Sequence, residues 1–121
     1  MRVLICDDEP DVRLLFRTAF EAEGVHVEEA GDGREAVEVV SEDPPDLVVL
    51  DLFMPEVDGL EALPKLRSTL PDVPILVVSA HAAVEVFGES RARGATACFD
   101  KVGFHVRIPE IIKRYGKPAP V

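Results

Sequence analysis

Short apolar runs alternate five times along the chain with stretches in which apolar residues recur every three or four positions. The runs at residues 3–6, 47–50 and 75–78 are continuous, whereas residues 25–29 alternate between apolar and polar side chains. Continuous runs of this length are typical of strands buried on both faces of a parallel sheet, and an alternating run is typical of a strand nearer the edge. With a fifth strand at residues 96–99, the pattern predicts a parallel sheet covered by helices on both faces.

The predicted helices differ in strength. Pro10 opens the first helix and Gly24 closes it, as proline and glycine often do at helix ends. Pro64 falls inside the third helix, where its ring and its missing amide predict a kink or a loosened first turn. The second and fifth helices are short, and the fourth has a thin apolar stripe that makes it a candidate for a mobile element. The second helix carries Ala36, Val37 and Val40. The fourth is expected at about residues 82–93 and the fifth at residues 109–115.

Composition changes this picture mainly by what it excludes. The 121 residues are 47% hydrophobic and 30% charged, as expected of one globular domain, which we assign to residues 1–116 before a short Pro-rich tail at 117–121. No apolar run approaches the roughly 20 residues of a membrane span, and the N-terminus lacks a secretory signal, so we expect a cytoplasmic protein without membrane contact. The net charge of -10 argues against direct nucleic-acid binding. Cys6 and Cys98 lie in apolar runs and are expected to be buried free thiols.

Polar side chains follow four of the predicted strands at the point where each strand ends. Asp7 and Asp8 follow the first strand, Asp51 ends the third, Ser79 ends the fourth and Lys101 follows the fifth. Because the carboxyl ends of parallel strands meet at one edge of a sheet, these side chains are expected to lie together. Each of them alone has an ordinary explanation as a cap, a turn residue or a solvated charge. Their joint occurrence at successive strand ends favours a functional site.

Three carboxylates at one edge repel one another, and a hard cation with oxygen ligands compensates that repulsion. Mg²⁺ suits such a site, because its octahedral shell leaves positions for phosphoryl oxygens. A phosphoryl group on one carboxylate also needs its charge neutralised from other sides, and the Lys101 ammonium and the Ser79 hydroxyl can do so. The pattern therefore predicts a magnesium-dependent phosphoryl site.

These residues and their order resemble the response-regulator receiver domain of two-component signalling, over essentially all of residues 2–115. The resemblance rests on residues 7–9 (Asp-Asp-Glu), residues 51–59 (Asp-Leu-Phe-Met-Pro-Glu-Val-Asp-Gly), Ser79-Ala80, and Lys101 after Gly94-Ala95. It implies a flavodoxin-like, doubly wound α/β fold with a five-stranded parallel sheet of order 2-1-3-4-5 and five helices. It also implies a phosphorylation-dependent switch in which Asp51 accepts a phosphoryl group from a phosphohistidine.

The resemblance assigns a role to each site residue. Asp8, Asp51 and the backbone carbonyl of Phe53 would bind Mg²⁺ directly, and Asp7 would act mainly through water. Lys101 would pair with the phosphoryl oxygens, and Ser79 would bond to them and shift the loop that precedes the fourth helix. The partners implied are a histidine kinase or histidine phosphotransfer protein and a downstream protein target, bound by a surface of the fourth helix, fifth strand and fifth helix. With nothing after Lys117 to form an output module, we expect the output to be protein contact.

Some positions near that surface depart from the family's commoner pattern. Cys98 stands three residues before the lysine, where the aromatic switch residue is usual, and the one-residue offset points the ring of Phe99 to the opposite face of the strand. Val102 replaces the usual proline after the lysine, so we expect a trans peptide bond there. Phe53 and His81 occupy positions that in the family tend to modulate the lifetime of the phosphorylated state, although the simpler interpretation of His81 is the solvent-exposed start of the fourth helix.

Two other function classes compete with the switch. A receiver-fold interaction module that acts without phosphorylation would keep the fold and not the chemistry; the retained site residues argue against it, and Cys98 and Val102 keep it open. A phosphatase with an aspartyl nucleophile would need a second Asp two residues after the nucleophile, where this chain has Phe53, which cannot transfer a proton. We therefore expect no enzyme activity beyond self-catalysed phosphoryl acceptance and autodephosphorylation.

Overall fold

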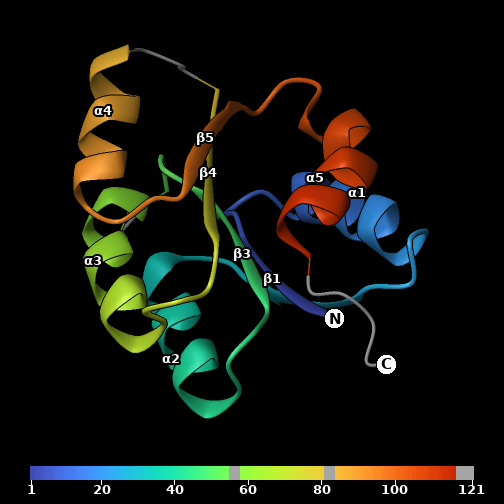
Figure 1. Ribbon diagram of the computed structural model, residues 1–121, viewed down its shortest axis with the longest axis horizontal. Coiled ribbons are helices and arrows are strands. Elements are labelled where there is room, and N and C mark those ends of the chain that lie inside the picture. The colour runs from blue at the N-terminus through green and yellow to red at the C-terminus, as the bar shows by residue number, and fades with distance from the viewer. Residues whose placement is uncertain (55–57, 81–83, 117–121) are drawn as a thin grey trace.

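The computed structural model describes residues 1–54, 58–80 and 84–116, which form a five-stranded parallel sheet between two layers of helices (Figure 1). The strand order is β2-β1-β3-β4-β5, as the resemblance implies, and every neighbouring pair is parallel, as the sequence pattern predicts. The strands are β1 Arg2–Cys6, β2 His26–Ala30, β3 Leu47–Asp51, β4 Ile75–Ser79 and β5 Ala97–Asp100. The helices are α1 Pro10–Glu21, α2 Gly33–Glu42, α3 Gly59–Thr69, α4 Val84–Ala92, the 3₁₀ helix η1 Phe104–Arg107 and α5 Ile108–Tyr115.

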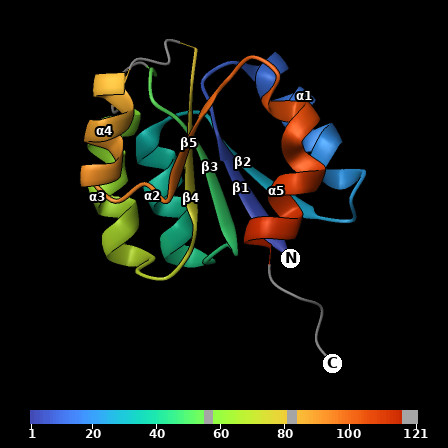
Figure 2. The same cartoon turned by 45° about the horizontal axis from the view of Figure 1, so that its top comes forward.

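The sheet separates two hydrophobic cores. Helices α1 and α5 cover one face, and α2, α3 and α4 cover the other (Figure 2). Alternate residues of the central strands point to opposite faces, so that Ile5 and Val49 pack toward α1 while Leu4 and Val48 pack toward α2 and α3. Every residue of β3 and β4 is buried, which explains why their sequences are continuous apolar runs.

The two edge strands are less buried than the centre. In β2, His26 is exposed and two further residues are only partly buried, in agreement with its alternating sequence. β5 forms the other edge, and its residues are partly buried or exposed. Cys98 is therefore half-buried rather than buried, a correction to the sequence-based expectation, because an edge strand has a neighbouring strand on one side only. Cys6, in the central strand β1, is a buried free thiol as predicted.

The helix ends follow the signals in the sequence. Pro10 lies in the first turn of α1. Asp58 caps α3 by accepting a hydrogen bond from the Glu61 amide at 2.9 Å, and Asp32 caps α2 in the same way through the Glu35 amide at 2.8 Å. Helix α5 is short, and η1, which the sequence pattern does not reveal, precedes it.

Helix α3 runs without interruption through Pro64. Because proline has no amide hydrogen, the carbonyl of Leu60 loses its normal helical partner. The Arg93 guanidinium replaces that partner, with its Nη1 donating to the Leu60 carbonyl at 3.0 Å. Its Nη2 bonds Glu89 Oε1 at 2.9 Å on the same side. Where the sequence predicts a kink or a loosened first turn, the structure supplies an outside donor for the Leu60 carbonyl, and the helix continues to Thr69.

Substituting Arg93 with alanine should therefore cost about 1 kcal/mol of stability, the usual net value of one hydrogen bond. In a Pro64→Ala background the cost should fall well below that, because alanine at position 64 would supply its own amide to the Leu60 carbonyl. Urea unfolding of the wild type, both single variants and the double variant forms the cycle that measures this coupling. Equal costs of Arg93→Ala in the two backgrounds would contradict the compensation.

Three further expectations concern one peptide bond, membrane-spanning helices, and residues that the structure does not describe. The Lys101–Val102 peptide is trans, since the described residues contain no cis bond. Within residues 1–54, 58–80 and 84–116, none of the helices has the length and hydrophobicity to cross a membrane. His81 and the Pro-rich tail at 117–121 lie outside the described residues, so the expectations for them stay predictions.

Candidate phosphoryl site

The register of the sheet brings the predicted site residues to one edge. Cys6 pairs with Leu50, so Asp7 follows β1 beside Asp51, the last residue of β3. Asp51 in turn pairs with Val78, the residue before Ser79. The Lys101 amide donates to the Ser79 carbonyl at 3.0 Å, which joins the ends of β4 and β5.

Three carboxylates converge at this edge, as the sequence predicts. One ligand atom each from Asp7, Asp8 and Asp51 can be chosen so that all lie within 4.8 Å of one another. Asp7 is only 1% exposed and Asp51 only 3%, whereas Asp8 is partly exposed. Two of the three carboxylates are thus buried away from water. An unpaired carboxylate in such a buried position is costly.

Lys101 supplies the counter-charge. Its Nζ lies 2.8 Å from Asp7 Oδ2 and 3.2 Å from Asp51 Oδ2, and its side chain is largely buried. Glu9 Oε1 approaches the same ammonium at 3.8 Å from the solvent side. Glu9 belongs to the acidic stretch that the sequence singles out, but its contact with Lys101 depends on the loop after β1 and could not be read from the pattern.

The electrostatics of this cluster are unbalanced toward negative charge. Burial and the neighbouring Asp7 charge together raise the pKa of Asp51 from its ordinary 3.8 to about 6, although Lys101 opposes both. Burial alone would lower the pKa of Lys101, but the Asp7 and Asp51 carboxylates outweigh it, so the pKa lies above its ordinary value. Lys101 therefore stays charged at neutral pH, while ionised Asp51 is held at a cost.

The donor set fits a hard divalent cation. Its oxygens come from carboxylates, the ligands that Mg²⁺ prefers. Asp7 Oδ2 is buried, and apart from its ion pair with Lys101 it accepts no aligned hydrogen bond from the described residues. A buried, under-satisfied carboxylate oxygen beside two other carboxylates is the kind of site that a cation completes.

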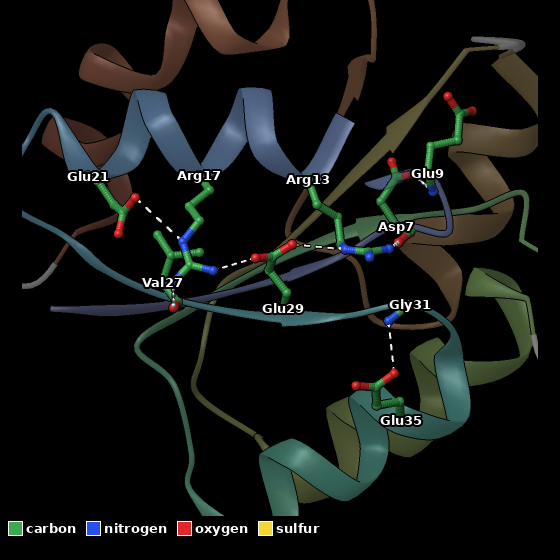
Figure 3. Close-up of polar contacts among 9 residues, drawn as sticks. All are labelled: Asp7, Glu9, Arg13, Arg17, Glu21, Val27, Glu29, Gly31 and Glu35. Carbon is green, nitrogen blue, oxygen red and sulfur yellow. Dashed lines mark hydrogen bonds and ion pairs between the residues drawn. The ribbon is translucent and has the colours of Figure 1, made fainter. Parts of the chain in front are cut away.

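A network from α1 holds the acidic stretch in place (Figure 3). Arg13 Nη1 donates to the Asp7 carbonyl at 2.7 Å, and Arg13 Nε bonds Glu29 Oε1 at 2.9 Å. The Asp7 side chain accepts from the Glu9 amide at 2.9 Å. Arg13 thus connects the peptide between Asp7 and Asp8 to β2. The sequence pattern gives no sign of this role of Arg13, because its partners come from other elements.

Gly59, the first residue of α3, packs directly against the backbone of Asp51. A Cβ atom at Gly59 would lie 2.3 Å from the Asp51 carbonyl oxygen and 2.6 Å from Leu52 Cα. The Gly59 amide also donates to the Leu52 carbonyl at 2.9 Å. The glycine at the end of the motif is therefore required by close approach of the helix to the strand end.

Two further predicted site residues differ in exposure. Ser79 is fully buried at the end of β4. The Phe53 amide donates to Asp51 Oδ1 at 3.4 Å, and the Phe53 side chain is 48% exposed beside the site.

Comparison with known proteins shows the family to which the chain belongs. The family model of the response regulator receiver domain matches residues 3–113. The chain belongs to this family. Receiver domains are signalling domains, and the three clustered carboxylates of this one fit the family's phosphorylation site.

Two relatives illustrate the similarity in sequence. Sporulation initiation phosphotransferase F of Bacillus subtilis is 30% identical over 114 residues, which cover 94% of this chain and 92% of that protein. The response regulator MprA of Mycolicibacterium vanbaalenii is 48% identical over 84 residues, covering 69% of this chain. The chain spans only 36% of the length of that regulator.

Solved structures agree with the fold. The chemotaxis protein CheY4 of Vibrio cholerae has 28% sequence identity and a TM-score of 0.87, with 94% of this chain and 97% of that chain covered. A CheY-like receiver domain protein of Methanospirillum hungatei has 27% identity and a TM-score of 0.88, with 93% and 90% covered. The flavodoxin-like architecture implied by the sequence is therefore confirmed.

The receiver domain departs from the common pattern at β5, and the structure gives the geometry. Cys98 packs toward α4, with its Sγ 3.7 Å from the Phe87 carbonyl. Phe99 points to the opposite face, where its ring centroid lies 5.6 Å from that of Phe104. The prediction that the two side chains face opposite ways is confirmed. The side chain of Cys98 thus lies on the α4 side of β5, and Val102 is 82% exposed.

Proposed function

We propose that the protein is a phosphorylation-dependent switch in which Asp51 accepts a phosphoryl group from a phosphohistidine of a histidine kinase or phosphotransfer protein. The observation that carries the proposal is the cluster of Asp7, Asp8 and Asp51 with the Lys101 ammonium between two of them. A purely structural ion pair would need one carboxylate, and the surplus of negative charge has a chemical use only when a cation and a phosphoryl group enter.

Asp8, Asp51 and the Phe53 carbonyl would hold Mg²⁺, and Asp7 would contact it mainly through water. When bound, Mg²⁺ would supply positive charge against the phosphoryl oxygens and lower the repulsion among the carboxylates. The Arg13 bond to the Asp7 carbonyl would keep the acidic stretch in register with Asp51.

In the transfer step an oxygen of ionised Asp51 attacks the phosphorus in line. An O–P bond forms, the N–P bond of the phosphohistidine breaks, and the imidazole leaves with the bonding electron pair. Lys101 stays protonated, because its pKa is raised, and turns its ammonium from Asp51 toward the phosphoryl oxygens. Hydrolysis of the acyl phosphate by water then regenerates the carboxylate.

The signal would leave the site through β4 and β5. The Ser79 hydroxyl would bond the phosphoryl group and draw the end of β4 toward it. Because the Ser79 carbonyl is bonded to the Lys101 amide, a shift of one strand end is passed to the other. The surface of α4, β5 and α5 would then change its affinity for a downstream protein.

Incubation with Mg²⁺ and acetyl phosphate tests this proposal. Intact-mass spectrometry should detect one labile phosphoryl adduct, and peptide mapping should locate it at Asp51. The adduct should be absent from Asp51→Asn and absent when EDTA removes the metal. Asp100→Asn is the matched control, because Asp100 lies at the same sheet edge, is exposed and should leave the adduct unchanged.

The competing function, an interaction module that acts without phosphorylation, predicts the opposite result. It would give no adduct with acetyl phosphate, and beryllofluoride would leave the spectrum of the site residues unchanged. Cys98 and Val102 are the observations that favour it, since both alter the output side of the domain. An adduct of equal yield on Asp51→Asn would also reject Asp51 as the acceptor.

A further inference from the structure

The nine arginines of the chain divide into three groups by their partners. Five form ion pairs with carboxylates, and one bonds backbone carbonyls at the end of α3. The remaining three, Arg91, Arg107 and Arg114, form no ion pair with any carboxylate in the described part of the chain. In a chain with 23 acidic residues, three arginines without a carboxylate partner call for an explanation.

All three line a single hollow of about 320 Å³. Arg91 comes from α4, Arg107 from η1 and Arg114 from α5, and β5 lies at the hollow with Cys98 and Phe99. Glu110 is the one acidic side chain in the lining. We call this feature the arginine pocket. Three cations from three elements meet there in a molecule whose net charge is -10.

Aromatic rings hold two of the guanidinium groups. Arg107 stacks over the Phe99 ring, with its central carbon 4.9 Å from the ring centroid, and Arg114 lies 5.5 Å from the centroid of Tyr115. Stacking of this kind uses the flat face of the guanidinium and leaves the N–H groups at its edge free to donate. The two arginines are thus pre-positioned, which lowers the entropy lost when an anion binds.

The chemistry of the pocket selects its ligand. Guanidinium forks bind carboxylates with two parallel hydrogen bonds. In a molecule of net charge -10, three arginines without carboxylate partners make the arginine pocket a favourable place for an acidic group. A peptide chain that carries several carboxylates can contact arginines on all three elements, whereas one small anion would contact only some of them.

We propose that the arginine pocket binds an acidic, carboxylate-rich segment of a partner protein. The identification of that partner as the downstream target rests on the proposed function. The pocket is suited to that role, because Cys98 in its lining is three residues before Lys101, whose ammonium contacts Asp51. A change at Asp51 thus reaches the pocket along one strand.

Binding of fluorescein-labelled hexaglutamate to the full chain, followed by fluorescence anisotropy at about 20 mM salt, tests the proposal. Wild-type protein should bind it, and hexaglutamine should not bind. Each of Arg91→Gln, Arg107→Gln and Arg114→Gln should weaken binding about threefold, and the triple variant about thirtyfold. Arg34→Gln, an equal change of charge on exposed α2, should leave the affinity unchanged.

Several outcomes would overturn it. These are failure of the wild type to bind hexaglutamate, equal binding by the triple variant when circular dichroism shows it folded, and tighter arginine-dependent binding of oligothymidylate than of hexaglutamate. If the triple variant fails to fold, the Arg91 and Arg114 single variants decide the question. A shift from dimer to monomer in the arginine variants with unchanged hexaglutamate binding would assign the pocket to a second copy instead.

The two proposals fail separately. Hexaglutamate binding needs no phosphorylation, so its loss with a normal adduct at Asp51 rejects only the arginine pocket. Binding without any adduct rejects only the switch. With beryllofluoride and Mg²⁺ the affinity should change by about threefold or more, because β5 joins the two sites. An unchanged affinity in a protein that does form the adduct would reject the pocket as the output surface.

Discussion

Replacing Arg67 with methionine is expected to destabilise the protein by about 3 kcal/mol, the largest loss we anticipate from a residue outside the core. Arg67 lies in the last turn of α3, and its guanidinium serves two loops at the opposite sheet edge from Asp51. Nε and Nη2 both donate to the Gly94 carbonyl, at 3.0 and 2.8 Å. Nη1 donates to the carbonyls of Leu70 and Val73, each at 2.7 Å.

The size of the effect follows from what would be left behind. Methionine keeps the apolar stem but donates no hydrogen bond, so several loop carbonyls would lose a charged donor at once. A hydrogen bond from a charged group is worth about 1.5–3 kcal/mol, and water can replace part of this at a half-buried site. Gly94 also fits Arg67 closely, since a Cβ there would lie 2.9 Å from Arg67 Cγ.

Urea unfolding of Arg67→Met beside Arg34→Met measures this loss. Arg34 is an exposed arginine on α2 with one loose ion pair, at 3.8 Å from Glu38, and its replacement should cost less than about 0.5 kcal/mol. Below its lowered melting temperature Arg67→Met should still accept a phosphoryl group, because the site at Asp51 is remote. Similar costs for the two variants would mean that water satisfies the loop carbonyls unaided.

Replacing Asp51 with asparagine should have the opposite sign and raise the stability of the metal-free protein by about 2 kcal/mol at pH 7.5. The pKa of Asp51 is raised to about 6 in the folded protein, chiefly by burial and by Asp7. A difference of about two pKa units corresponds to roughly 3 kcal/mol with the opposing Lys101 contact already included, and this is the upper limit for an amide that replaces the ionised carboxylate. Asparagine removes the buried charge and keeps the volume of the side chain.

The pH dependence of the free energy of unfolding tests the sign of this effect independently. Between about pH 4 and pH 6 the folded protein holds a proton on Asp51 that the unfolded chain releases, so the contribution of this group to stability falls as pH rises through that window. Below pH 4 the carboxyl is neutral in both states and no penalty remains. The advantage of Asp51→Asn should therefore be small near pH 4, grow through pH 6 and level off above it.

Urea unfolding in EDTA at several pH values measures this difference. Adding Mg²⁺ should stabilise the wild type more than Asp51→Asn and so narrow the gap. Asp100→Asn serves as the control, because its side-chain oxygen can still accept from the Val102 amide and its charge lies outside the cluster. A metal-free Asp51→Asn that is less stable than the wild type at pH 7.5 would mean that the Asp51 carboxylate is a structural group.

The parts of this molecule that could be predicted from sequence are those fixed by local periodicity. The strands and their order of alternation with helices follow from apolar runs, and a parallel sheet then brings Asp7, Asp51 and Lys101 to one edge. The site could be predicted from the sequence for that reason, because each of these three residues directly follows or ends a strand. The resemblance to receiver domains added the strand order and the roles of the residues.

The parts that were missed depend on long side chains that reach across elements. Arg67 and Arg13 bond backbone carbonyls of distant loops, and a carbonyl leaves no mark in the sequence. The partner of the Leu60 carbonyl was hidden in the same way, because Arg93 lies 33 positions further along. The half-exposure of Cys98 was missed because edge position is a property of the whole sheet.

The bond between Arg93 and the Leu60 carbonyl also constrains how α4 can respond to events at Asp51. It tethers the C-terminal end of α4 to α3, while the other end begins at Val84, on the side of the sheet edge that carries Ser79. Any displacement of α4 that keeps this bond must pivot about Arg93 and sweep its first turn through the widest arc. In the proposed switch, the proline of α3 would thereby place a hinge at the end of the neighbouring helix α4.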